Sequence, residues 1–168
     1  MTISLYSASV PVFQANLKNL KGVLAKGAAF AAAKKVDESV LLGARLAPDM
    51  LPMGRQVQIA CDFAKGGAAR LAGMDVPKWE DTEKSFADMA ARIDKTIAYI
   101  SDFTAAQIDG QEERDITIPV GGTPMTFKGQ HYLLLVVMPN FYFHMTTAYA
   151  LLRHNGVEIG KGDFLGRS

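Results

Sequence analysis

Cysteine, histidine and tryptophan are scarce in this chain, which has one, three and one of them among 168 residues. The single cysteine, Cys61, excludes an internal disulfide, is expected to be a small buried core residue, and favours a cytoplasmic location. The formal net charge is only +1 with no basic stripe, so a nucleic-acid partner has no electrostatic support. The N-terminus lacks the basic start and long apolar segment of a signal peptide.

Long hydrophobic runs are also missing. The densest one, Leu133 to Met138, is far shorter than the about 20 apolar residues that a membrane-spanning helix needs, so no membrane partner is expected. The chain shows no internal repeat and no low-complexity tract. Its length and its hydrophobic share of 49% suit a single domain, residues 1–168, with its own core.

The stretch from Gln130 to Gly156 predicts one long helix. Asn155 and Gly156 mark its end, because glycine adopts the left-handed conformation that closes helices. Pro139 removes one backbone hydrogen bond and predicts a kink near Leu135. Apolar residues at steps of three and four place one predicted face on the core: Leu135, Met138, Tyr142, Met145, Tyr149 and Leu152.

Three further long helices are expected before it, each with an apolar stripe at helical spacing. They cover Leu5 to about Ala33 with a break at Gly27, Asp49 to Gly73, and Asp81 or Thr82 to about Phe103. A short helix, Glu38 to Leu46, is expected after Asp37 as its cap. The third long helix has the cleanest heptad-like pattern, and Arg92 is assigned to its solvent-facing side.

A β-hairpin is expected before the last helix. Two segments with alternating apolar residues, Asp115 to Val120 and Thr123 to Lys128, flank the glycine pair at 121 and 122, a typical turn signal. Pro119 and Pro124 restrict the two segments to edge-like pairing. The sequence therefore predicts an all-α fold, a four-helix bundle with a small β-hairpin before the last helix.

Long motifs in this chain resemble a bacterial domain-of-unknown-function family. The central motifs are Arg45 to Met50 and Gln56 to Phe63, and the C-terminal motif extends from Pro139 to Gly166. The similarity covers essentially the whole chain. That family belongs to the DinB/YfiT-like metalloenzyme superfamily, whose members are four-helix bundles and often dimers. The resemblance therefore implies this fold and a homodimer.

The resemblance also implies where a metal would lie. The superfamily commonly holds nickel or zinc on three histidines, one on the second helix and two placed four residues apart on the last. When His144 is aligned with the second histidine of that pair, Asn140 takes the first position and Gln56 the place on the second helix. Amides are weak neutral ligands for such ions. No cofactor is therefore predicted, and a bound nickel or zinc ion would depend on His144.

The candidate pocket contains six residues: Gln56, Asn140, His144, Asp49, Asp62 and Tyr142. His144 is interpreted either as a lone ligand or general base, or as a buried histidine bonded to a neighbouring helix, and the second interpretation is favoured. Aromatic residues 141 to 143 surround the helix, so at least one of them must leave the core and face a pocket or a partner subunit.

The two aspartates of this set have mainly structural interpretations. Asp49 is expected to pair with Arg45 and to fix the turn before the second long helix. Asp62 is expected to pair with Lys65 or Arg70, or to face solvent. If Asp62 is buried near His144, it becomes the carboxylate that orients the imidazole.

Two functions from different classes are compatible with this sequence. The first is a homodimeric bundle protein that binds a small molecule in an apolar pocket between helices. The second is an enzyme of the DinB/YfiT-like type, a transferase or hydrolase that depends on a metal or a thiol cofactor. The enzyme needs polar groups around an ion or cofactor at His144, whereas the binding protein needs only an apolar cavity. No Gly-x-Ser-x-Gly, paired-carboxylate or phosphate-loop motif is present.

Overall fold

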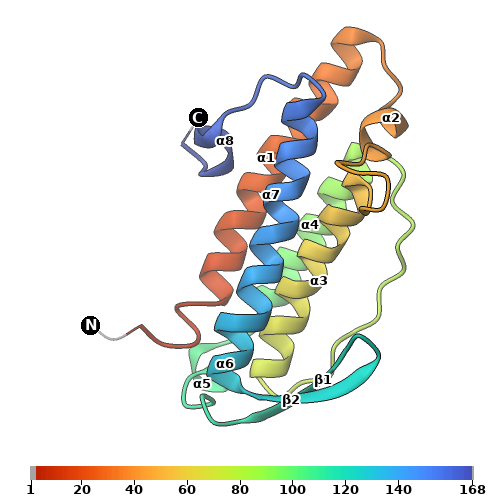
Figure 1. Ribbon diagram of the computed structural model, residues 1–168. Coiled ribbons are helices and arrows are strands. Elements are labelled where there is room, and N and C mark those ends of the chain that lie inside the picture. The colour runs from red at the N-terminus through yellow and green to blue at the C-terminus, as the bar shows by residue number, and fades with distance from the viewer. Residues whose placement is uncertain (1–2, 168) are drawn as a thin grey trace.

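Four long helices form where the sequence carries its apolar stripes (Figure 1). The computed structural model describes residues 3–167, and the long helices are α1 (Val10–Lys34), α3 (Met53–Leu71), α4 (Phe86–Ser101) and α7 (Met138–His154). Both α4 and α7 pack against α3 and also against α1, so the four helices surround one hydrophobic core. The predicted four-helix bundle is confirmed. Within residues 3–167, no helix has both the length and the apolar character that crossing a membrane requires.

The helices α1 and α7 run in one direction, and α3 and α4 run in the other (Figure 1). Gly54 at the start of α3 lies against Met89 near the start of α4. Gly67 near the end of α3 lies against Val137, directly before α7. The parallel pair α3 and α4 requires a long connection, residues 72–85, which returns along the bundle; we call it the return segment.

The helix α4 begins at Phe86, later than the predicted start at Asp81 or Thr82. Ser85 is its cap: the Ser85 hydroxyl accepts from the Asp88 backbone N–H at 3.0 Å, and the Asp88 carboxylate accepts from the Ser85 N–H at 3.0 Å. Asp81 is paired instead with the side chains of Arg55 and Arg92. These ion pairs hold Asp81 outside the helix, which explains the late start.

The first long helix also begins later than predicted. The residues after Leu5 form turns, and α1 starts at Val10 with proline in its first turn, where a backbone N–H is not needed. Gly27 does not break α1. A Cβ atom at Gly27 would lie 3.1 Å from the ring of Phe86, so this glycine provides the space in which α4 packs on α1.

Between α1 and α3 lies a short helix, α2 (Glu38–Leu42), which ends four residues before its predicted end at residue 46. Asp37 caps α2 as predicted, because its carboxylate accepts from the Ser39 N–H at 2.8 Å. The helix α3 follows Pro52 and begins at Met53. Its apolar residues at helical spacing are buried throughout: Met53, Val57, Cys61, Ala64, Ala68 and Leu71.

The predicted hairpin is confirmed with its boundaries. The strands β1 (Asp115–Val120) and β2 (Thr123–Lys128) pair antiparallel, with the first residue of β1 opposite the last of β2. Gly121 and Gly122 both have positive φ, at 57° and 86°, as a tight two-residue turn requires. The short helix α5 (Ala105–Ile108) precedes the hairpin, and the buried Ile116 fixes β1 to the end of the bundle.

A π-helical segment lies where a kink was predicted, before Pro139. The short helix α6 (Gly129–His131) leads into this segment, η1 (Tyr132–Val137), and α7 follows directly. Pro139 lies in the first turn of α7 and has no N–H to offer to the preceding turn. Wider π-helical turns are one way for a helix to accommodate such a gap.

The buried face of the last helix differs from the predicted one. Leu135 is 63% exposed and Tyr142 is 37% exposed, although both were predicted to face the core. A π-helical turn contains more residues than an α-helical turn, so η1 rotates the residues around it relative to a regular helix. Buried residues instead follow mainly at steps of four: Leu133, Val137, Phe141, Met145, Ala148 and Leu152. A last short helix, α8 (Lys161–Phe164), packs on α1.

Candidate functional site

Gln56 of α3 and His144 of α7 form a direct hydrogen bond, with 2.6 Å between Gln56 Oε1 and His144 Nδ1. Gln56 Nε2 donates to the Leu51 carbonyl at 2.9 Å, so the amide oxygen faces the imidazole and His144 Nδ1 is the donor. The ring of His144 also stacks on Phe63, with 5.9 Å between the centroids. Burial lowers the pKa of His144, which favours the neutral imidazole.

Asn140 does not join this pair. Its Nδ2 donates to the Val136 carbonyl, one turn back in the same helix, at 2.7 Å. The oxygen of Gln56 is already occupied by His144. Within the described part of the chain, no group of three His, Cys, Asp or Glu side chains is placed to hold a metal ion. One imidazole and two occupied amides do not fit nickel or zinc, which prefer imidazole, thiolate or carboxylate ligands.

Two other members of the predicted pocket, Asp49 and Tyr142, are not bonded to Gln56 or His144 either. Asp49 is exposed, and Arg45 donates to the carbonyl of Met50, so the predicted pair between Arg45 and Asp49 is wrong. The hydroxyl of Tyr142 is 3.4 Å from the side-chain nitrogen of Asn16, on α1. Of the six predicted pocket residues, the structure thus joins only Gln56 and His144 by a side-chain bond.

Asp62 belongs to a separate cluster. Its carboxylate lies 2.9 Å from Lys65, a predicted partner, and 3.1 Å from Arg92. The assignment of Arg92 to the solvent-facing side of its helix is wrong, because the side chain is only 2% exposed. A long guanidinium side chain can lie inward when carboxylates neutralise its charge.

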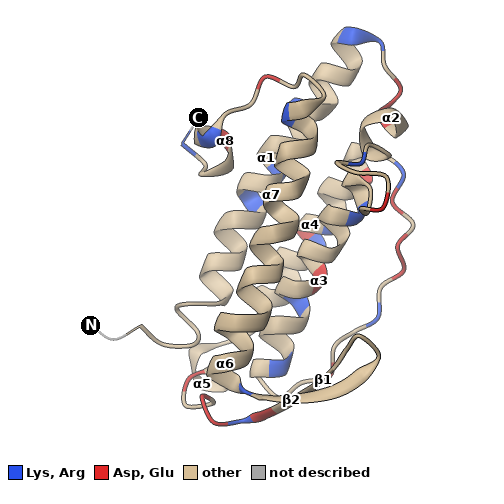
Figure 2. Cartoon of the chain, in the orientation of Figure 1, with Lys and Arg blue, Asp and Glu red and all other residues tan. Residues whose placement is uncertain are grey.

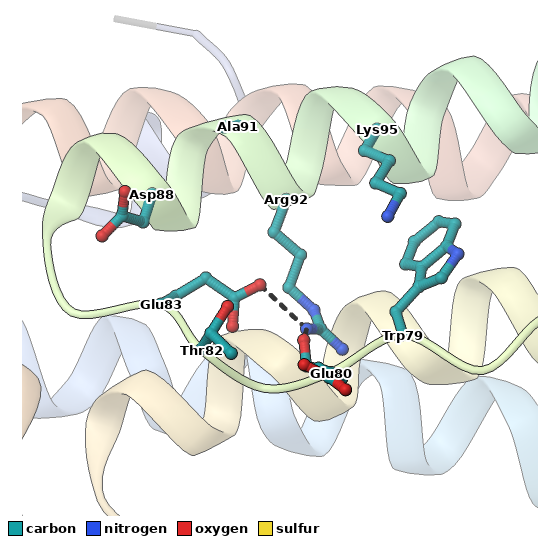
Figure 3. A pocket seen from close by; sticks show the side chains of 8 residues that line it. All are labelled: Trp79, Glu80, Thr82, Glu83, Asp88, Ala91, Arg92 and Lys95. Carbon is teal, nitrogen blue, oxygen red and sulfur yellow. Dashed lines mark hydrogen bonds and ion pairs between the residues drawn. The ribbon is translucent and has the colours of Figure 1, made fainter.

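Arg92 connects α4 to the return segment (Figure 3). Its Nη1 lies 2.9 Å from Glu83 and 2.9 Å from Asp81. Burial raises the pKa of Glu83, but hydrogen bonds from Arg92, a backbone N–H and Gln58, together with the positive charge of Arg92, outweigh this and lower that pKa below its ordinary value. The ionised cluster holds the return segment against α3 and α4.

Trp79, the chain's one tryptophan, forms a second attachment of the return segment. The ammonium groups of Lys65 and Lys95 each lie 4.3 Å from its ring centroid, within the range of cation–π attraction. The edge of the ring also contacts Tyr99 at 5.9 Å between centroids. Figure 3 shows Trp79 on the return segment with Lys95 above it on α4.

A cavity of about 600 Å³ lies beside Trp79 and is bounded by α3, the return segment, β1 and the start of η1. Its volume is within the usual range for small-molecule sites. Aromatic and aliphatic side chains make up much of its wall, and one carboxylate, that of Asp62, lines it. Three aromatic residues and three cations contribute to the lining: Phe63, Trp79, Tyr132, Lys65, Arg70 and Lys78.

Arg70 and Tyr132 are joined inside this cavity. Arg70 Nη1 donates to the Tyr132 hydroxyl at 3.1 Å. Burial raises the pKa of Tyr132, although the nearby guanidinium opposes the shift, so the phenol keeps its proton. Cys61, in contrast, is unsuited to chemistry: it is fully buried, and burial raises the pKa of its thiol to about 12.

Comparison with known proteins identifies the family. The model of a domain of unknown function, DUF1993, matches residues 5–165. The chain belongs to the DUF1993 family. A search of curated proteins gives no match for this DUF1993 chain. Among solved structures, it is similar to a crystal structure of a DinB family member from Shewanella denitrificans: the sequences are 44% identical, the match covers 96% of this chain and 92% of that one, and the TM-score is 0.89. The predicted relation to the DinB-like superfamily is confirmed.

The cavity of this DUF1993 chain was not predicted from its sequence. Its lining comes from four segments that are far apart along the chain, so no local spacing marks it. One signal was available: Trp79, the only tryptophan, lies two residues after Pro77 in a polar connector instead of in an apolar stripe. A large aromatic residue outside the helical stripes is a reason to look for a binding surface.

Proposed function

We propose that this DUF1993 protein binds a small organic molecule in the cavity beside Trp79. The observation that carries the proposal is the combination of a volume of about 600 Å³ with aromatic walls and a few convergent polar groups. The proposed site differs from the pocket predicted at His144, where Gln56 and the imidazole satisfy each other. Phe63 links the two places, since it stacks on His144 and also lines the cavity.

Apolar contact alone would give weak binding. A flat two-ring molecule that buries roughly 200 Å² of its apolar surface gains about 5 kcal/mol at 25 cal/mol per Å². That free energy corresponds to a Kd of roughly 200 µM. A tighter natural ligand would therefore also use the polar groups of the cavity.

The proposal is tested with N-phenyl-1-naphthylamine, a neutral aromatic probe that accepts excitation energy from tryptophan. Trp79 is the only donor tryptophan in the chain and lies in the cavity wall. Ile118→Phe places a phenyl ring in the lining, whereas Val120→Phe places the same ring at an exposed position of the same strand. We expect energy transfer in the parent and in Val120→Phe, and its loss in Ile118→Phe. Equal transfer in all three proteins would contradict binding at this site.

We also propose that the protein is a homodimer that pairs through the outer face of η1 and α7. Leu135 and Phe143 are 63% and 55% exposed on this face. Figure 2 shows α7 free of Lys, Arg, Asp and Glu up to its C-terminal end. A two-fold contact with a second copy would cover both apolar faces at once. Sedimentation should give twice the chain mass of 18.2 kDa, and a Leu135→Glu, Phe143→Glu double variant should be monomeric. A monomeric parent would contradict the dimer.

The alternative function, an enzyme that depends on a metal or a thiol cofactor, has less support because the residues around His144 do not fit the metal. The test is the metal content of protein purified without a histidine tag and without chelator, next to a His144→Ala variant. We expect no stoichiometric nickel or zinc in either protein. Near-stoichiometric metal in the parent and none in the variant would favour the enzyme.

A further inference from the structure

The charges that line the cavity do not cancel. Three cations and one carboxylate contribute to its wall. Lys65 is only 4% exposed, and its ammonium is 2.9 Å from the carboxylate of Asp62, so these two neutralise each other. Arg92 also contacts Asp62. The positive charges of Arg70 and Lys78 are therefore left facing the cavity without a carboxylate that balances them there.

Arg70 has hydrogen-bond donors to spare. A guanidinium carries five N–H groups, and within residues 3–167 the one hydrogen bond of the Arg70 side chain goes to the hydroxyl of Tyr132. That hydroxyl accepts from Arg70, so its own hydrogen is available to a further acceptor. Tyr132 is 2% exposed and is held in place by its burial. Arg70 and Tyr132 thus present adjacent donors at a fixed position.

Lys78 adds a further positive charge to the lining of the same cavity. It is an exposed residue of the return segment, and within the described residues no carboxylate lies within 4.0 Å of its ammonium group. A planar guanidinium, a phenol and a flexible ammonium form a set of donors that suits an oxyanion. The apolar side chains of Phe63 and Ile118 line the same cavity and suit the apolar body of such a molecule.

We infer that the ligand of this cavity is an organic anion, whose oxyanion group is bound by Arg70, Tyr132 and Lys78 and whose apolar body packs against Phe63 and Ile118. The inference rests on the proposed function, because it names the chemical class of the molecule that the cavity binds. Carboxylate, sulfonate and phosphate ester groups share the required chemistry.

The test compares two probes with the same aromatic skeleton. 1-Anilinonaphthalene-8-sulfonate carries a sulfonate, and N-phenyl-1-naphthylamine is the neutral compound without it. Both are titrated against the parent, Arg70→Gln, Lys78→Gln and the control Lys84→Gln, which removes a charge from the same segment outside the cavity lining. Thermal unfolding followed by circular dichroism verifies that each variant is folded.

We expect the sulfonate to bind the parent about tenfold more tightly than the neutral probe, since charge-assisted hydrogen bonds are stronger than neutral ones. Arg70→Gln and Lys78→Gln should each weaken binding of the sulfonate several-fold and leave binding of the neutral probe unchanged. Lys84→Gln should change the binding of neither probe. Added salt should weaken only the binding of the sulfonate.

The outcomes separate the two proposals. If both probes bind equally in all four proteins and Ile118→Phe abolishes the binding of both, the cavity binds ligands but the inference that its ligand is an anion is overturned. If Ile118→Phe changes neither probe, binding at the cavity itself is wrong, and the inference fails with it. Selective weakening of sulfonate binding in both Arg70→Gln and Lys78→Gln supports both proposals.

Discussion

Replacing Arg92 by methionine would remove the guanidinium that Asp62, Asp81 and Glu83 share. Methionine is unbranched and replaces the apolar stem of the arginine, so packing around that stem is largely kept. The change therefore mainly deprives three carboxylates of a common cation. Since two of them belong to the return segment, the segment should also loosen from α4.

The expected cost is about 2–3 kcal/mol of the free energy of unfolding. Breaking a fully buried ion pair by removing one partner costs about 3–5 kcal/mol, because the remaining charge stays uncompensated. Here Asp62 and Asp81 keep 40% and 34% of their side-chain surface exposed, and Lys65 and Arg55 still pair with them. For a chain of this length the melting temperature should fall by about 8 °C.

Urea unfolding followed by circular dichroism measures this cost. The matched control is Lys21→Met, which breaks an ion pair between α1 and α4 whose side chains are 42% and 56% exposed. That pair should be worth less than about 0.5 kcal/mol. Emission of Trp79 should also shift to longer wavelength in Arg92→Met as the return segment loosens. A loss in Arg92→Met no larger than in Lys21→Met would refute the reasoning.

Three further predictions concern single side chains. The pKa of Glu83 is held below its usual 4.5 in the folded state, so its contribution to the free energy of unfolding is present above pH 4.5 and is lost as the pH falls through the folded value. Urea unfolding measured from pH 6 downward, on the order of one pH unit at a time, should therefore show a smaller acid-induced loss of this free energy in Glu83→Gln than in the parent. A methyl group at Gly67 would lie 2.8 Å from a carbon atom of η1, whereas at Gly22 nothing lies within 4 Å. Thermal melts should therefore show Gly67→Ala destabilised by about 1–3 kcal/mol and Gly22→Ala stabilised by about 0.5–1 kcal/mol; equal effects would contradict close packing at Gly67. Gln56→Leu removes the acceptor of His144 Nδ1, so the NMR-detected pKa of His144, already lowered by burial, should fall further, and an increase would contradict the bond.

The elements of this fold could be predicted from the sequence because their signals are local. The stripe from Met53 to Leu71 repeats at helical spacing, and every residue of it is buried. The glycine pair at 121 and 122 predicted the turn of the hairpin, and both residues have the positive φ that such a turn needs. The family motifs added the arrangement of the helices, which spacing alone does not determine.

The errors have non-local causes. Arg92 lies at a polar position of its helix, and only the distant carboxylates of Asp62 and Glu83 explain its burial. The last helix is apolar on nearly every side, so two stripes fit its sequence equally well, and the π-helical segment decided between them. The cavity beside Trp79 exists because the return segment and the hairpin both come back to α3.

The most direct test of ligand binding at this cavity is the indole N–H resonance of Trp79. A chain with one tryptophan gives one such NMR signal, and Trp79 lines the proposed site. On addition of 1-anilinonaphthalene-8-sulfonate, this signal should shift with saturation in the parent and stay unchanged in Ile118→Phe. A probe that binds the protein without moving the indole signal of the parent would contradict the proposed site.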